Sequence, residues 1–184
     1  MNLDFYSISS HKIHGPKGIG AIIIREGLNI KKQFFGGAQE NNFRAGTVAV
    51  ELASAFAKAA DLFTERECLQ IKNKQDYLIR QLKLFTPEIR INGPADQRLI
   101  TNINFSIPGI ESKHILKFMD QNNIRVSAGS ACNSNKKTPS KTLLSIGQTE
   151  TQANEGVRIS LGIKTTQSDL DQFLFILKKI KTQK

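Results

Sequence analysis

The feature that most constrains the fold is a helical pattern from Val48 to Phe85 that contains neither proline nor glycine. Its second half places apolar residues at three- and four-residue steps, namely Cys68, Ile71, Leu78, Leu82 and Phe85. This spacing is typical of a helix that buries one face, with Cys68 as a small core residue. A single helix of this length is expected to join two lobes. It is expected to end before Pro87, because proline interrupts a helix.

The segment before this pattern indicates a sheet. Residues 21–26, AIIIRE, are a continuous apolar run, which predicts a strand buried on both faces of a mostly parallel sheet. Residues 3–9, LDFYSIS, predict a second strand. Residues 34–47, FFGGAQENNFRAGT, predict a polar, glycine-rich loop with a function of its own.

The segment after Pro87 predicts an α+β domain with an antiparallel sheet. Strands are expected in residues 88–92, 101–107, 124–129 and 156–162, and helices in residues 111–123, 138–147 and 165–181. Thr166 and Asp169 form the pattern of a capping box at the start of the last helix. We therefore expect two domains, residues 1–65 and residues 66–184.

Composition excludes several classes of protein. The net charge is +10, but lysine and arginine are spread along the chain, and with no tryptophan and two tyrosines the chain is poor in rings for base stacking. Two cysteines do not make a disulfide framework, and no apolar run approaches the ~20 residues of a membrane helix. We expect a cytoplasmic protein with no nucleic-acid, membrane or metal partner.

Lys12 lies in a polar stretch, SSHKIHGPKGIG, between the two expected strands. A lysine in a buried corner between strand and turn loses hydration, so its amine can attack a carbonyl and form a Schiff base. Ser9, Ser10 and His11 offer hydroxyl and imidazole donors to a phosphate. The stretch fits an anchor for pyridoxal 5′-phosphate, whereas no complete GxGxxG or GxxxxGK[ST] motif for a nucleotide is present.

Cys132 and Arg158 are the other two candidates. Cys132 lies among small and polar residues in SAGSACNSNKK, which predicts an accessible loop where a thiol can be either a nucleophile or chemically idle. Arg158 alternates with apolar residues in GVRISLG, so it points away from the apolar face. It is either a surface arginine or a two-pronged clamp for a carboxylate.

Four motifs together resemble the NifS/IscS-type cysteine desulfurases, a branch of the class V aminotransferase-like, pyridoxal phosphate-dependent enzymes. These motifs are SISSHKIHGPKGIGA, GGAQENNFRAGT, SAGSACNS and GVRISLG, in that order. The resemblance implies an α/β fold, the carboxyl-terminal portion of a pyridoxal phosphate-dependent transferase. Residues 1–65 would be the end of the large, mostly parallel sheet domain, and residues 66–184 the small α+β domain.

The resemblance also implies roles for single residues. Lys12 would bind the cofactor covalently, and Ser9 and His11 would hold its phosphate, together with Thr47, which reaches the phosphate of the neighbouring subunit. Cys132 would accept sulfur from L-cysteine as a persulfide, while alanine is released. Arg158 would clamp the substrate carboxylate.

Relatives in this family are about twice as long, and the half that precedes the lysine carries the aspartate for the pyridine nitrogen and the histidine that stacks on the ring. Asp4 cannot replace that aspartate, since it lies eight residues before Lys12 on an expected strand, up to ~26 Å away. Ala38 stands where the family loop has a third glycine, which puts a tight turn in doubt.

Three hypotheses remain open. The chain is the carboxyl-terminal half of a desulfurase that works with a separately encoded amino-terminal half, or a catalytically inactive remnant that binds a partner, or, as the weakest, a basic module for nucleic acid. The first implies a homodimer mate and a sulfur acceptor or iron–sulfur scaffold protein as partners. The isolated chain is expected to be inactive.

Overall fold

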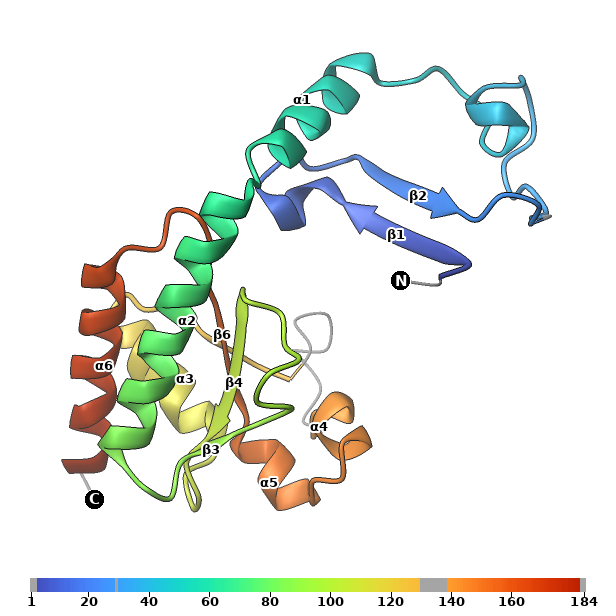
Figure 1. Ribbon diagram of the computed structural model, residues 1–184. Coiled ribbons are helices and arrows are strands. Elements are labelled where there is room, and N and C mark those ends of the chain that lie inside the picture. The colour runs from blue at the N-terminus through green and yellow to red at the C-terminus, as the bar shows by residue number, and fades with distance from the viewer. Residues whose placement is uncertain (1–2, 29, 130–138, 183–184) are drawn as a thin grey trace. The chain divides into compact units, whose positions relative to one another are not determined.

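The computed structural model describes residues 3–28, 30–129 and 139–182 (Figure 1). The chain divides into two units, residues 1–65 and residues 66–184. Both helices and strands occur, as expected for the predicted α/β class. The identification of the units as the end of a cofactor-binding domain and a small carboxyl-terminal domain stays a prediction.

The first unit is built around two strands. They are β1 (Phe5–Ser9) and β2 (Gly20–Ile24), which pair antiparallel and are followed by α1 (Val50–Asp61). Two short 3-10 helices lie between these elements, η1 (Ser10–Ile13) and η2 (Glu40–Asn42). Both strands were predicted, but the burial of β2 was not predicted correctly for this chain. Ile22 and Ile23 are each 57% exposed, because they point to opposite faces of a sheet that has only two strands.

The long helical pattern is two helices rather than one. α1 ends at Asp61, and three residues separate it from α2 (Glu65–Phe85). The prediction of a single helix was wrong because Leu62 and Phe63 continue the apolar pattern across the break. Thr64 followed by Glu67 is the sequence signal of a new helix start.

The second unit contains a four-stranded antiparallel sheet in the order β3-β4-β6-β5. The strands are β3 (Arg90–Ile91), β4 (Asn102–Ser106), β5 (Ser127–Ala128) and β6 (Val157–Ser160), and the helices after α2 are α3 (Ser112–Gln121), α4 (Lys141–Ser145), α5 (Glu150–Glu155) and α6 (Gln167–Thr182). In Figure 1, α2, α3 and α6 lie on one side of the sheet and α4 on the other. The helix α5 was not predicted.

The core of the second unit lies between the sheet and the helices α2, α3 and α6. Ile71, Leu78, Phe105, Ile115 and Val157 have no exposed surface. The rings of Phe105 on β4 and Phe173 on α6 meet edge to face, with 6.3 Å between centroids. Cys68, predicted as a core residue, is only half-buried, because the buried stripe of α2 begins at Ile71.

Capping boxes define two helix starts in the second unit. At α6, the Thr166 backbone N–H donates to Asp169 Oδ2 at 2.7 Å, and the Asp169 N–H donates back to Thr166 Oγ1 at 3.1 Å, as predicted. The Asp169 carboxylate accepts from the backbone N–H and from the hydroxyl of Thr166, and these two hydrogen bonds lower the pKa of Asp169. At α5, Thr149 and Gln152 make the same reciprocal pair, which accounts for a helix start in a polar stretch.

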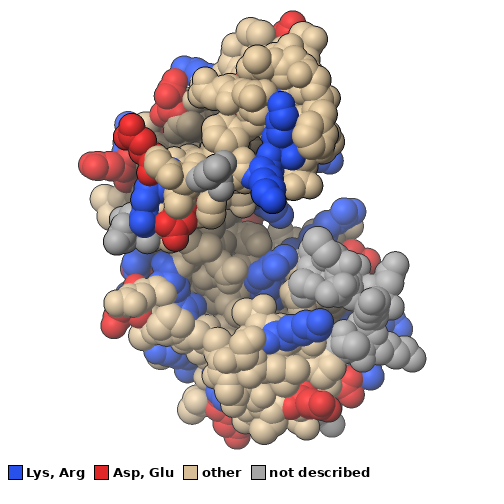
Figure 2. Space-filling view, turned by 90° about the vertical axis from the view of Figure 1, so that its right-hand side faces the viewer, with Lys and Arg blue, Asp and Glu red and all other residues tan. Residues whose placement is uncertain are grey.

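Basic side chains are distributed over the surface. On the face that Figure 2 shows, blue lysine and arginine side chains occur at several separate places, with red acidic side chains among them. Within the described ranges, no helix combines the length and apolar character that crossing a bilayer demands.

Candidate functional site

The turn that carries Lys12 has a fixed backbone. Lys12 lies on η1, directly after β1. The Ser10 N–H donates to the Ile19 carbonyl at 3.2 Å, and the Gly15 N–H donates to the Ser10 carbonyl at 3.0 Å. These bonds close the turn at both ends, so the position of the Lys12 backbone is set by the β1–β2 hairpin.

The same turn is seated on α1 through very close packing. A Cβ atom at Gly15 would lie 2.1 Å from Ser10 Oγ and 3.1 Å from the Cβ of Ala59, so only glycine fits there. Ser10 is fully buried and Ala59 is 8% exposed. His14 closes η1 in the left-handed region, at φ 65°. The sequence prediction did not identify Ser10, Gly15 and Ala59 as the seat of the turn.

Three side chains at this turn are open to solvent, whereas Ser10 is buried. Ser9, His11 and Lys12 are all exposed, and the Ser9 hydroxyl makes no capping hydrogen bond to η1. The prediction that Lys12 sits in a buried corner is therefore wrong for this chain, because the described residues around η1 cover its backbone but not its side chain. What the turn presents is a row of hydroxyl, imidazole and amine groups with no acidic residue in it.

Thr47 lies in the same unit, exposed, between the glycine-rich loop and α1. The loop is held by its own residues: the Arg44 guanidinium lies over the Phe34 ring at 5.6 Å, and the Gly46 N–H donates to Gln39 Oε1 at 3.2 Å. Ala38 does not take a positive φ. Glu40, Asn41 and Asn42 do so instead, at 51°, 52° and 65°, and they make the turn of the loop.

Arg158 lies on β6 in the second unit, with a half-buried side chain flanked by the buried Val157 and Ile159. Its side chain therefore leaves the sheet on the face opposite the apolar core, as predicted. Its Nε atom is buried and has no hydrogen-bond partner within the described part of the chain. A buried N–H without an acceptor is uncommon in folded proteins.

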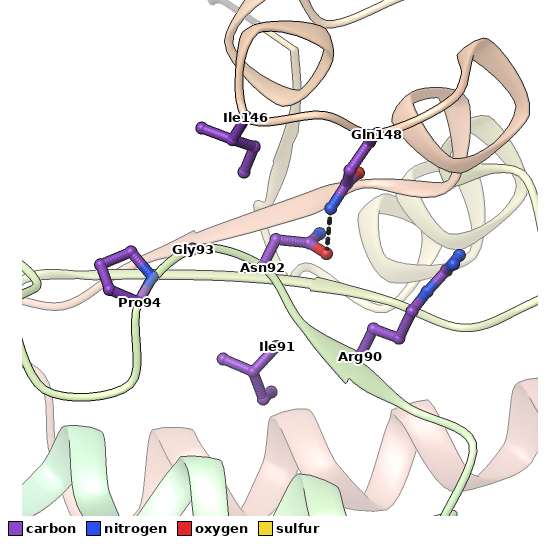
Figure 3. Close-up of a pocket in the computed structure, with 7 residues that line it drawn as sticks. All are labelled: Arg90, Ile91, Asn92, Gly93, Pro94, Ile146 and Gln148. Carbon is purple, nitrogen blue, oxygen red and sulfur yellow. Dashed lines mark hydrogen bonds between the residues drawn. The ribbon is translucent and has the colours of Figure 1, made fainter.

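A cavity of about 520 Å³ lies beside β3 in the second unit (Figure 3). It is lined by Arg90, Ile91, Asn92, Gly93, Pro94, Ile146 and Gln148. The Arg98 guanidinium donates to the carbonyls of Asn92, Gly93 and Pro94, which fixes one wall. No local pattern signals this cavity, because its walls come from residues 90–94 and 146–148.

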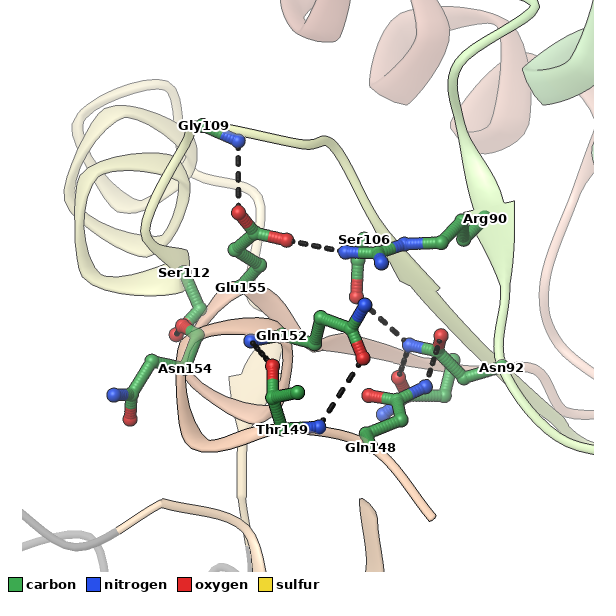
Figure 4. A network of polar contacts seen from close by, with 11 residues as sticks. Arg90, Asn92, Ser106, Gly109, Ser112, Gln148, Thr149, Gln152, Asn154 and Glu155 are labelled. Atoms are coloured by element: carbon green, nitrogen blue, oxygen red, sulfur yellow. Dashed lines mark hydrogen bonds and ion pairs between the residues drawn. The ribbon is translucent and has the colours of Figure 1, made fainter. Parts of the chain in front are cut away.

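A network of polar contacts continues from this cavity to α5 (Figure 4). Gln148 Nε2 donates to Asn92 Oδ1 at 2.6 Å. Arg90 forms an ion pair with Glu155 at 2.5 Å, and the Gly109 N–H donates to the other oxygen of that carboxylate at 2.8 Å. Glu155 is 5% exposed, so the network satisfies a buried charge.

The predicted site residues are thus placed in part. Ser9, His11 and Lys12 lie together at the end of β1, with Thr47 in the same unit and Arg158 in the other. Cys132 lies outside the described residues. Within the described ranges, no three or more His, Cys, Asp or Glu residues gather in a way that could hold a metal ion.

Comparisons with known proteins show the family of this chain. Residues 1–173 match the Aminotransferase class-V family, and the chain belongs to this family. Over its whole length the chain is 41% identical to the cysteine desulfurase IscS of Clostridium botulinum (strain Hall), covering 48% of that protein. Over 98% of its length it is 39% identical to the cysteine desulfurase IscS of Dictyoglomus turgidum, covering 46% of it.

A solved structure shows the same fold. The NifS-like protein from Rickettsia africae matches with a TM-score of 0.84 and 31% identity, over 98% of this chain and 48% of that one. The resemblance to NifS/IscS-type desulfurases is therefore confirmed. The chain spans about half the length of the curated relatives it matches.

Class V aminotransferases and cysteine desulfurases depend on pyridoxal 5′-phosphate, and the η1 turn fits part of this cofactor. The Ser9 hydroxyl is not used for capping, and His11 and Lys12 are exposed beside it, so donors for a phosphate and an amine for an aldehyde are available. The turn offers no carboxylate for the pyridine nitrogen. Asp4 is paired with Arg25 at 3.0 Å, and it lies at the other end of β1 from Lys12.

Proposed function

We propose that this chain supplies the carboxyl-terminal half of a cysteine desulfurase, which moves sulfur from L-cysteine to Cys132 and releases alanine. It would do so only together with an amino-terminal half, the part of its relatives that this chain does not span. The observation that supports this proposal is the exposed Ser9–Lys12 turn, which has donors and no acid, in a chain that spans about half of its relatives.

The residues of this chain would have distinct tasks. Lys12 would hold the cofactor and move protons at its Nζ, while Ser9 and His11 would bind the phosphate. Thr47 would bind the phosphate in a neighbouring subunit, which makes a homodimer part of the proposal. Arg158 would orient the substrate carboxylate through its planar fork of N–H donors.

Pyridoxal 5′-phosphate, when bound, draws electrons from an attached amino acid and so makes the substrate sulfur open to attack. The thiol of Cys132 must be deprotonated to accept that sulfur, and it would then pass it as a persulfide to a sulfur acceptor or iron–sulfur scaffold protein. The amino-terminal half would supply the carboxylate that the η1 turn lacks, and it would shield Lys12 from water.

Co-expression tests this proposal. The chain should form sulfide and alanine from L-cysteine when produced with the amino-terminal half, and neither product when produced alone. Lys12→Ala should lower the rate by at least about 10²–10⁴-fold, the usual range for a group that moves protons in the reaction. Lys17→Ala is the matched control, because Lys17 is an exposed lysine of the same unit outside η1. Cys132→Ser should abolish sulfide release and keep the cofactor colour.

A second measurement addresses the chain alone. Mixed with the cofactor and reduced with borohydride, the isolated chain should carry no cofactor on Lys12 in peptide mass analysis. A trapped adduct there without any partner would contradict the need for the other half. A co-expressed pair that binds the cofactor but forms no alanine would instead favour an inactive, partner-binding remnant.

A further inference from the structure

The sheet of the second unit has one apolar and one polar face. The apolar face carries Ile91, Ile103, Phe105, Val157 and Ile159, and the polar face carries Arg90, Asn92, Asn104, Ser106, Ser127 and Arg158. Arg158 lies at the centre of the polar face, directly opposite Asn104 on β4 and Ser127 on β5. Its neighbours therefore decide what its guanidinium can bind.

Asn104 is the closest of these neighbours. The Leu161 N–H donates to the Thr101 carbonyl at 2.8 Å. Thr101 and Leu161 lie opposite each other just beyond the ends of β4 and β6, so they form a hydrogen-bonded pair of this antiparallel ladder. Counting along the ladder, Asn104 and Arg158 form a non-hydrogen-bonded pair, the class whose side chains approach most closely. Their Cβ atoms are expected to lie about 4.5–5.5 Å apart.

A relay of amide groups fixes how Asn104 is turned. Gln148 Nε2 donates to Asn92 Oδ1 at 2.6 Å, and Asn92 Nδ2 donates in turn to Asn104 Oδ1 at 2.6 Å and to Ser106 Oγ at 2.9 Å. Asn92 is 7% exposed, so this arrangement is held inside the protein. The oxygen of Asn104 therefore accepts from Asn92 beside β3, and the Asn104 NH₂ group donates no hydrogen bond within the described residues.

Arg158 has a buried Nε without a hydrogen-bond partner in the described part of the chain. The amide oxygen of its strand neighbour Asn104 accepts from Asn92 instead. The other group of that amide is an NH₂ donor, and a donor cannot satisfy a guanidinium. An added anion, whose oxygens only accept, could satisfy both the guanidinium and the Asn104 NH₂ group.

We propose that Asn104, held by Asn92 and Gln148, forms with Arg158 a two-residue site for a carboxylate. Asn104 is then a substrate-binding residue, and Asn92 and Gln148 are positioning residues. This inference rests on the proposed function, because the carboxylate that the site would bind is that of the amino-acid substrate. The relay directs the Asn104 oxygen to Asn92, and within the described residues the Arg158 Nε is left without an acceptor.

The test uses the full chain without cofactor, labelled with ¹⁵N in arginine, and follows the Nε–H signal of Arg158, assigned by its loss in Arg158→Lys. Sodium propionate is the probe, propionamide is the uncharged control, and sodium phosphate tests for a general anion site. The Arg158 signal should shift with propionate and saturate, and it should not respond to propionamide. Phosphate should bind more weakly than propionate.

Four variants separate the roles. Asn104→Leu should weaken propionate binding about 10-fold, because a hydrogen bond to a charged group is lost. Asn92→Leu should weaken it about two- to ten-fold, since the Asn104 amide is then free to turn its oxygen to Arg158. In Asn104→Asp the new carboxylate should accept from Arg158, so the Nε–H signal moves before any probe is added. Asn102→Leu is the matched control, two residues away on the same face of β4, and should bind as the wild type does.

The outcomes distinguish the two proposals. If Arg158 does not respond to propionate in the wild-type chain, its assignment as the carboxylate residue fails, and this inference fails with it. If Arg158 responds equally in wild type, Asn104→Leu and Asn102→Leu, the inference is overturned while the proposed function stands. An equal response to phosphate would show a general anion site and would also overturn it. In the co-expressed enzyme, Asn104→Leu should raise KM for L-cysteine more than it lowers kcat.

Discussion

The two units of this chain bury their residues very differently. In the second unit, Leu78, Phe105 and Val157 have no exposed surface and lie in one core between a sheet and three helices. Among the described residues of the first unit, Ser10 and Ala59 are the buried ones, while Ile22 and Ile23 are each 57% exposed. The comparison teaches that the second unit has the core of an independent domain, whereas the first has too little buried apolar surface to define a stable fold by itself.

The sharpest test of this comparison is a matched pair of core substitutions. Phe105→Ala should lower the free energy of unfolding of the second unit by about 3–5 kcal/mol, because it leaves a cavity under Phe173. Ile22→Ala should cost less than about 1 kcal/mol in the isolated chain, since its side chain is largely solvated already. Amide hydrogen exchange, followed peptide by peptide, measures both. Equal losses of unfolding free energy from the two substitutions would contradict the difference in burial between the units.

A smaller effect is expected from the polar network of the second unit. Glu155→Gln removes the charge that pairs with Arg90 and keeps an oxygen for the Gly109 N–H. We expect the free energy of unfolding to fall by about 1–3 kcal/mol. The value should lie toward the lower end of this range, because the Arg90 side chain is 36% exposed. Urea unfolding followed by circular dichroism measures it. Glu150→Gln, an exposed acid on the same helix, is the control, and a loss as large as that of Glu155→Gln would contradict a specific role for the network.

The smallest effect concerns the start of α6 and depends on pH. Hydrogen bonds from the Thr166 backbone and side chain hold the pKa of Asp169 below its ordinary value. The ionised Asp169 therefore stabilises the folded state above its pKa in the unfolded chain, about 3.9. This stabilisation is lost as the pH falls through the lower pKa that Asp169 has in the folded state. Asp169→Asn should destabilise the second unit at pH 7 and make little difference below that range. Thermal unfolding at a series of pH values measures this, and a constant difference at all pH values would contradict it.

Local patterns in the sequence predicted much of the second unit. The capping box at Thr166 and the apolar spacing of α2 each depend on residues within a few positions of one another, so both could be read directly. The break after Asp61 was missed because Leu62 and Phe63 keep the apolar pattern. The helix α5 was missed because it has six residues and only the Thr149 capping box marks it.

The candidate site was predictable only where it is contiguous in the chain. Ser9, His11 and Lys12 are neighbours in sequence and remain so in the structure. The exposure of Lys12 could not be predicted from its own stretch, because burial depends on which distant segments cover it. The relay from Gln148 through Asn92 to Asn104 joins residues up to 56 positions apart, and no local pattern signals it.

The two-stranded sheet of the first unit also has a consequence for how the protein is made. β1 and β2 pair only with each other in the described structure, so each has a row of backbone N–H and C=O groups without a strand beside it, next to the solvated side chains of Ile22 and Ile23. Such an apolar, open-edged ribbon is a template on which further copies can add. We expect overproduction of this chain by itself to give a larger insoluble fraction than balanced synthesis with a covering polypeptide.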